Sequence, residues 1–242
     1  WISPEAYRLA SGERLVASLR VGEDFKGNSM IYNPGNVRSF KIDRGGEGVR
    51  FSSVVGDDPA LDVKLNAPGL HVLTYFSKPS TYTFKSWKKF EDYVAGKGIE
   101  PVLGQHRQRG LPDKDFDEAY ARCAKALVQV GDVGGQDRAM GMPLELVAAA
   151  NPYRENIAEG LPVQLLWQGK PLANAQIKVF LRDGSAPLNT WLLRTDAKGQ
   201  ARIDVSRQGE YLLNAVHMIV PETVKDADWE SYWASLTFRI GG

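Results

Sequence analysis

Three histidines are the residues of this chain with the clearest capacity for chemistry. They are His71, His106 and His217, in a chain of 242 residues. A neutral imidazole is a good ligand for nickel, cobalt, copper and zinc. No His-x-His, His-x-x-x-His or Glu-x-x-His pair is present, so a metal site must be assembled from distant segments. The alternative is that the three rings are isolated and structural. His106 lies in the polar stretch 104–110, which is expected to be a loop, so its ring is expected to be exposed.

Two further side chains extend this candidate ligand set. Met218 stands beside His217, and thioethers select soft ions such as Cu(I). Glu145 interrupts the apolar run 143–147, where a carboxylate must be paired, metal-ligating or on the solvent face of an alternating strand. The sequence therefore predicts a nickel, cobalt or copper site drawn from His71, His106, His217, Glu145 and Met218.

Catalytic motifs are missing from the sequence. There is no Gly-x-Ser-x-Gly, no His-Glu-x-x-His and no phosphate-binding Gly-x-x-x-x-Gly-Lys-Ser/Thr. Cys123, the single cysteine, lies on an apolar stripe and is expected to be a buried, inert thiol. Arg122 and Lys125 on the same segment are expected to form a solvated basic face, with anion binding as the alternative. We predict a protein that binds rather than catalyses.

Charge and hydropathy restrict the partners. Thirty basic residues against 29 acidic ones leave a net charge of +1, and the two signs are interleaved along the chain. Nucleic-acid binders usually carry a basic stripe, so we expect no nucleic acid. No run approaches the roughly 18 apolar residues of a membrane helix, so we expect no direct membrane insertion. The chain opens with Trp1 rather than Met, which we interpret as processing or trimming, so the lack of a leader does not count against export.

Alternating side chains predict β-strands in the first part of the chain. Period-two alternation with glycine or proline turns between the runs is typical of a β-sandwich. The strands are expected over 13–21, 37–43, 49–55, 62–65 and 70–76.

Helical spacing then replaces the alternation. Trp87, Phe90, Tyr93 and Val94 predict a helix over 83–95. A longer apolar stripe, with acidic residues at its start and basic ones later, predicts a second helix over 113–130. The glycine-rich segment 131–143 is expected to be a linker.

The remaining residues predict a second sandwich. Strands are expected over 162–168, 175–181, 191–195, 201–205 and 210–218, with a turn residue between each pair. The fold class is therefore mainly β, with two antiparallel β-sandwich domains, immunoglobulin-like or transthyretin-like, and a helical insert of two helices. The predicted division is 1–82 (N-terminal sandwich), 83–130 (helical insert), 131–143 (linker) and 144–242 (C-terminal sandwich).

Three motifs carry a resemblance to a known fold family. The stretches GKPLANA, TDAKGQA and GEYLL begin at Gly169, Thr195 and Gly209. In these positions the second half of the chain resembles the transthyretin-like, or carboxypeptidase-regulatory-like, sandwich. An Asp-x-x-Gly sequence suits a tight hairpin because glycine accepts a positive φ.

The chain as a whole resembles a more specific family of exported proteins of unknown function, associated with nickel or cobalt uptake. The matching stretches are WISP at 1–4, GLHV at 69–72, KFEDY at 89–93, GMPLELV at 141–147, AVHM at 215–218 and DWES at 228–231. The resemblance implies a periplasmic location and a role beside a membrane transport component.

Two functional hypotheses follow. The first is a periplasmic metal-binding or metal-delivery accessory protein of the nickel/cobalt class, or for copper, which the resemblance implies and whose partners are the ion and a transport component. The second is a non-enzymatic interaction or adhesion module that binds a transporter, receptor or carbohydrate through its sandwich loops. This second hypothesis rests on analogy between folds.

Overall fold

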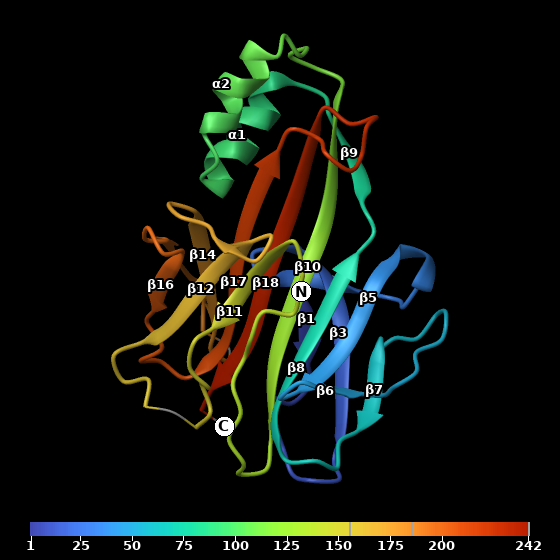
Figure 1. Ribbon diagram of the computed structural model, residues 1–242, viewed down its shortest axis with the longest axis vertical. Helices are drawn as coiled ribbons and strands as arrows, with labels where there is room; N and C mark the ends of the chain where they lie inside the picture. Colours follow the sequence, from blue (N-terminus) through green and yellow to red (C-terminus); the bar gives the residue numbers. More distant parts are fainter. Residues whose placement is uncertain (155, 185, 242) are drawn as a thin grey trace.

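A computed structural model describes residues 1–154, 156–184 and 186–241, and within them the chain is mainly β (Figure 1). One sheet runs through the whole molecule and contains ten of the described strands. Across this central sheet the order is β15 (Asn189–Arg194), β14 (Gln176–Arg182), β17 (Gly209–Ile219), β18 (Trp229–Ile240), β10 (Phe116–Val130), β8 (Gly69–Ser77), β5 (Val37–Arg44) and β6 (Glu47–Val49). The short strands β2 (Arg8–Leu9) and β9 (Ser80–Phe84) also pair with β10.

Two smaller sheets cover the central one. The first contains β1 (Ile2–Pro4), β3 (Arg14–Glu23), β4 (Lys26–Met30) and β7 (Leu61–Lys64). The second contains β11 (Leu144–Ala148), β12 (Leu161–Trp167), β13 (Lys170–Pro171) and β16 (Gln200–Ile203). Each packs on the central sheet through its own apolar core, so the predicted sandwich layering and the two-helix content are confirmed.

Strand β10 is shared by both cores. Its residues Ala121, Cys123 and Leu127 lie in the core beneath β11 and β12, whereas Ala124 and Val128 lie in the core beneath β1 and β3. Successive side chains of a strand point to opposite faces, so neighbouring residues of β10 pack into different cores. The strand is therefore buried on both sides along most of its length.

The helical cap covers one end of the central sheet. Helices α1 (Trp87–Lys97) and α2 (Pro101–Gln108) lie over the ends of β10, β17 and β18 (Figure 1). Their shared core is built around Phe90, Phe116 and Trp229. Ser86 caps α1, and its side chain accepts the backbone N–H of Lys89. A 3-10 turn over Pro34–Asn36 precedes β5.

The predicted helix over 113–130 is wrong, because these residues form strand β10. Both faces of the strand are apolar, so its apolar residues also occur at i, i+3 and i+4 and imitate a helical stripe. The second helix is instead α2, in the polar stretch that was expected to be a loop. Lys125, expected on a solvated face, is buried.

Most of the predicted strands are confirmed, one is wrong, and several strands were missed, β4, β9 and β18 among them. The strand expected over 49–55 ends at Val49, where β6 stops. Strand β18 was missed because polar residues occupy buried positions in it, among them Glu230, Ser231 and Thr237. Each of these is held by a hydrogen bond, which an alternation pattern cannot show.

The central sheet joins the two halves of the chain. Strands β10 and β18 pair in parallel from Glu118–Trp229 to Ala126–Thr237. The predicted linker 131–143 connects β10 to β11 without a helix or strand, and its Asp137 is buried. The division into domains stays a prediction about which parts fold alone. In the part of the chain that the structure describes, no helix is long and apolar enough to cross a membrane.

The shared sheet generates a test of that division. Residues 144–242 expressed alone are expected to give no cooperative thermal transition, because β18 then lacks β10 and the core beneath β11 and β12 loses Cys123 and Leu127. Circular dichroism melts and amide dispersion in NMR spectra measure this, with the full chain as the control. A dispersed, cooperatively melting fragment would establish the predicted C-terminal domain.

Candidate functional site

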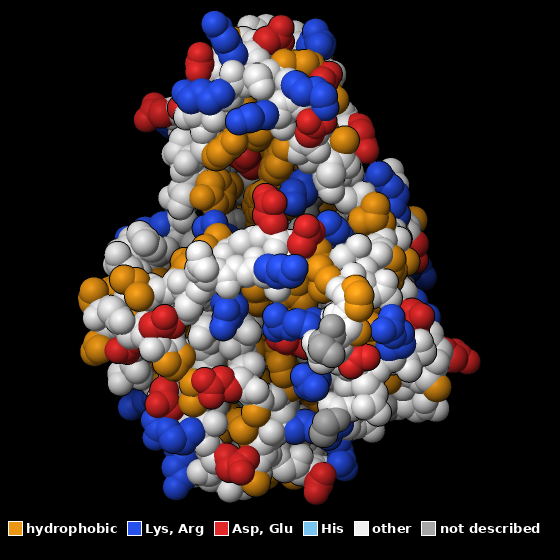
Figure 2. Space-filling model, turned by 180° about the vertical axis from the view of Figure 1, so that it is seen from behind, with side chains coloured by type: hydrophobic (Ala, Val, Ile, Leu, Met, Phe, Trp, Pro, Cys, Tyr) orange, Lys and Arg blue, Asp and Glu red, His pale blue; other side chains and the backbone are white. Residues whose placement is uncertain are grey.

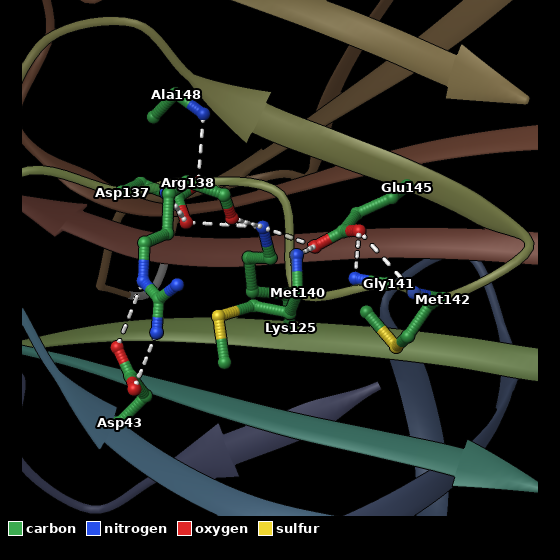
Figure 3. Close-up of polar contacts among 9 residues, drawn as sticks. All are labelled: Asp43, Lys125, Asp137, Arg138, Met140, Gly141, Met142, Glu145 and Ala148. Atoms are coloured by element: carbon green, nitrogen blue, oxygen red, sulfur yellow. Dashed lines mark hydrogen bonds and ion pairs between the residues drawn. The ribbon is translucent and has the colours of Figure 1, made fainter. Parts of the chain in front are cut away.

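A buried ammonium lies at the centre of the molecule. Lys125 projects from β10, and its side chain is 1% exposed. Its Nζ lies 3.0 Å from Oδ1 of Asp137 and 2.8 Å from Oε1 of Glu145, and it also donates to the carbonyl oxygen of Arg138 at 3.0 Å (Figure 3). The side chains of the two acids are 0% and 2% exposed. One cation therefore contacts two carboxyl groups, and all three side chains are shielded from water.

Backbone N–H groups donate to all four oxygens of these carboxylates. Glu145 accepts from Met140 at 2.7 Å, Gly141 at 3.1 Å and Met142 at 3.3 Å. Asp137 accepts from Ala148 at 2.8 Å and from Arg138 at 2.7 Å. Burial raises the pKa of Asp137, and Lys125 with these donors opposes the rise. Of the three alternatives for Glu145, the structure shows the ion-paired one.

Arg138 extends the cluster to the central sheet. Its Nε lies 3.1 Å and its Nη2 2.6 Å from the two carboxylate oxygens of Asp43 on β5 (Figure 3). This bidentate pair is only partly exposed, because Asp43 is buried and Arg138 is half-exposed. The segment that follows β10 is thus fastened to β10, β11 and β5 by charged groups.

A groove of about 880 Å³ begins where this cluster ends. Arg138, Ala139 and Met140 form one wall, and β5 with the stretch from Gly48 to Ser53 forms the rest. Tyr32, Phe40 and Phe51 supply aromatic surface, with Phe40 and Phe51 in edge-to-face contact at 5.1 Å. The basic side chains are Arg38, Lys41, Arg50 and Arg138. Sequence reasoning missed this site, because its residues come from three segments and form no motif.

The groove is positively charged. Asp43 is the acidic residue among its lining residues, and Arg138 already neutralises it. In the described part of the chain, Arg38, Lys41 and Arg50 have no carboxylate within ion-pair distance. All three are exposed. Exposed cations without counter-ions favour an anionic ligand.

The structure does not bring the three histidines together. His71 on β8 stands opposite Val128, whereas His217 on β17 stands opposite Tyr232, the neighbour of Ala121. Val128 and Ala121 are seven residues apart on β10, which is about 23 Å along a strand. Within the described residues, no group of three or more His, Cys, Asp or Glu side chains is arranged to hold a metal.

His106 differs from its expectation. It lies on α2 and is fully buried in the cap, not exposed in a loop. Its Nδ1 accepts the indole N–H of Trp229 at 3.0 Å, and its Nε2 lies 3.0 Å from the carbonyl oxygen of Pro112. Both ring nitrogens are thus engaged, with the proton on Nε2. Because the neighbours of His106 in the sequence are polar, no local pattern indicated that its ring faces the apolar core of the cap from a short helix.

The other candidate ligands lie in separate surroundings. Nδ1 of His71 lies 3.2 Å from the carbonyl oxygen of Gly69, and the ring of His217 lies 4.7 Å from that of Trp167. Burial lowers the pKa of both imidazoles. Met218 is buried in the core of the cap. Cys123 is buried as expected, although on a strand, and burial raises the pKa of its thiol to about 12.

Comparison with known proteins gives one family. The sequence model of a family described as "Domain of unknown function (DUF4198)" matches residues 1–219. No curated protein matches the chain. Among solved structures, the tetra-tandem repeat in the extending region of a large adhesion protein has a TM-score of 0.26 and 11% identity, over 99% of this chain and 48% of that one.

The buried cluster generates a stability prediction. Lys125→Met is expected to lower the free energy of unfolding at neutral pH by about 3–5 kcal/mol, because two buried carboxylates lose their cation. Without the cation the folded-state pKa of Asp137 rises further. A carboxyl with a raised folded-state pKa costs stability as the pH rises above its unfolded-state pKa, about 3.9, and the cost is complete above the folded-state pKa, so the loss should shrink toward about pH 4.

Urea unfolding of wild type and variant across this pH range measures the effect. Arg14→Met, which breaks the exposed Arg14–Asp62 pair, is the control and should change stability far less. Equal losses in the two variants, or a loss independent of pH, would contradict a charge-balancing role for Lys125.

Proposed function

This chain belongs to the DUF4198 family, whose model covers most of it, and we propose that it is a non-enzymatic binding protein that holds an anionic ligand with apolar parts in the groove along β5. The observation that carries the proposal is the lining of that groove. Four basic side chains and three aromatic rings surround a volume of about 880 Å³, and its carboxylate is already paired. Ligand sites commonly combine apolar walls with a few charged groups that fix orientation.

The engagement of the reactive side chains supports binding over catalysis. Lys125 and Glu145 contact each other inside the protein. The rings of His106 and Trp229 form a hydrogen bond in the core of the cap. The thiol of Cys123 is protonated at neutral pH because its pKa is about 12. These groups therefore hold the fold, whereas Lys41 and Arg50 of the groove are exposed and have no ion-pair partner among the described residues.

Metal delivery is the second candidate, favoured by one observation. Burial lowers the pKa of His71 and His217, so both imidazoles are neutral at neutral pH, the form that ligates nickel, cobalt and copper. The resemblance to exported nickel/cobalt uptake proteins and to transthyretin-like sandwiches suggests that this activity belongs in the periplasm, beside a transport component.

Metal delivery has its own test. Wild-type protein dialysed against Ni²⁺, Co²⁺ or Cu²⁺ is expected to retain metal, and His71→Ala and His217→Ala to retain less, by elemental analysis. Because the two rings lie on different strands at different levels, each variant separately identifies its own contribution. Full retention in both variants would remove these histidines from the site.

The groove proposal predicts a preference for negative charge. Benzoate and indole-3-acetate are expected to shift the backbone amide resonances of β5 and of residues 48–53, and the neutral amides of the same acids to shift them less. Arg50→Glu should weaken binding of the acids, because it removes one cation from the groove and adds an anion.

Lys170→Glu is the matched control, since Lys170 is exposed on β13 and lies outside the groove lining. Shifts spread evenly over the surface, or equal shifts from acids and amides, would count against the proposed function.

A further inference from the structure

We infer that the groove along β5 takes an acidic segment of a partner polypeptide in extended form, which adds to the central sheet as a new strand. This inference rests on the proposed function and names its ligand class. The pairing of β5, the lining of the groove, the charge in it and the apolar side chains beside it each support the inference.

Strand β5 has an open edge. On one side it pairs with β8 from Val37 to Asp43. On its other side β6 covers only Ile42, Asp43 and Arg44. In the part of the chain that the structure describes, the outer edge of residues 37–41 therefore has no strand partner, and Figure 1 shows β5 at the margin of the main sheet. Outward N–H and C=O groups along such an edge are a template for another strand.

The groove follows this edge. All seven consecutive residues from Val37 to Asp43 line it. Because successive side chains of a strand point to opposite faces, a cavity that contacts all of them lies along the edge and meets both faces. The five residues 37–41 extend over about 16 Å at the usual rise of a strand. That matches the ordinary length of a strand, about five or six residues.

The cations of the groove indicate that a bound peptide carries acidic side chains. Arg38, Lys41 and Arg50 lie along the groove without carboxylate partners in the described residues. Successive side chains of an added strand would point to the two faces of the sheet. Carboxylates at alternate positions would therefore all lie on one face, and on one face of β5 Lys41 stands opposite Thr74 while Arg38 lies over the ring of Phe76.

Apolar residues flank the same edge. Ile31, Val54 and Val55 are 60%, 66% and 70% exposed. They adjoin Tyr32 and Ser53, which line the groove. Figure 2 shows hydrophobic side chains gathered at the margin of the molecule where the loop after β6 lies. A peptide with aliphatic residues between its acidic ones would cover part of this apolar surface, whereas an anionic polysaccharide would not.

A short peptide tests the inference directly. The probe is a capped peptide of about seven residues that alternates valine with glutamate. Its control is the same sequence with N-methyl groups on alternate amides, which keeps the charges and blocks strand hydrogen bonds. Binding is measured by fluorescence anisotropy of a labelled peptide, and amide hydrogen exchange of β5 is followed by NMR.

The expected result has three parts. The unmodified peptide binds and slows exchange of the outward amides between Val37 and Lys41, and the N-methylated peptide does neither. Lys41→Glu or Arg50→Glu weakens binding by about tenfold, whereas Lys170→Glu does not. Added salt weakens binding, because the attraction between exposed charges is screened.

Three results would overturn the inference. One is equal binding of the two peptides, and another is binding without protection of β5 amides. The third is binding of a heparin oligosaccharide at β5 with no binding of the peptide. In each of these cases, the preference of the groove for benzoate over benzamide still decides the proposed function separately.

Discussion

The ion pairs of Lys125 are the contacts on which the centre of this molecule depends. An ammonium and two carboxylates without contact with water are unfavourable singly and acceptable only together. Here they join β10 to the segment after it and to β11. Arg138 carries the same connection to Asp43 on β5. A chain of charged contacts therefore fixes the irregular segment 131–143, which carries few apolar residues of its own.

The shape of the groove depends on that cluster of charged residues. Ala139 and Met140 form part of its wall, and the backbone N–H of Met140 is held by Glu145. The opposite wall is a strand of the central sheet. A binding surface supported on both sides by fixed elements loses little freedom when a ligand arrives. The buried charges thus support binding by holding the wall of the groove in place, whereas the exposed charges would contact the ligand.

Sequence reasoning recovered the elements that show a clear alternation, a run of strand-forming residues or a helical stripe. Strands β3, β5, β8, β12, β14 and β17 were predicted from alternation or from strand-forming residues, and α1 from its apolar stripe and stop signals. It failed at β10, which is buried on both faces along most of its length and whose apolar residues also occur at helical spacing. It missed β18, whose buried Glu230 and Ser231 look exposed in a sequence.

The candidate site was less accessible to such reasoning. Glu145 stood out because it breaks an apolar run, but its partner Lys125 lay in a segment interpreted as a helix surface. The groove has no motif, since its walls come from residues 32–43, 48–53 and 138–140. Side chains that meet only through long-range pairing leave no local pattern to find.

The parallel pairing of β10 with β18 also determines when the central sheet can be completed during synthesis. The partners are separated by about 110 residues, and β18 enters between β10 and the already emerged β17. Until residues 229–240 leave the ribosome, the first half of the chain presents β10 with one edge exposed. A nascent chain of this design therefore remains vulnerable to misassociation until late, and a holdase that shields that edge would improve its yield.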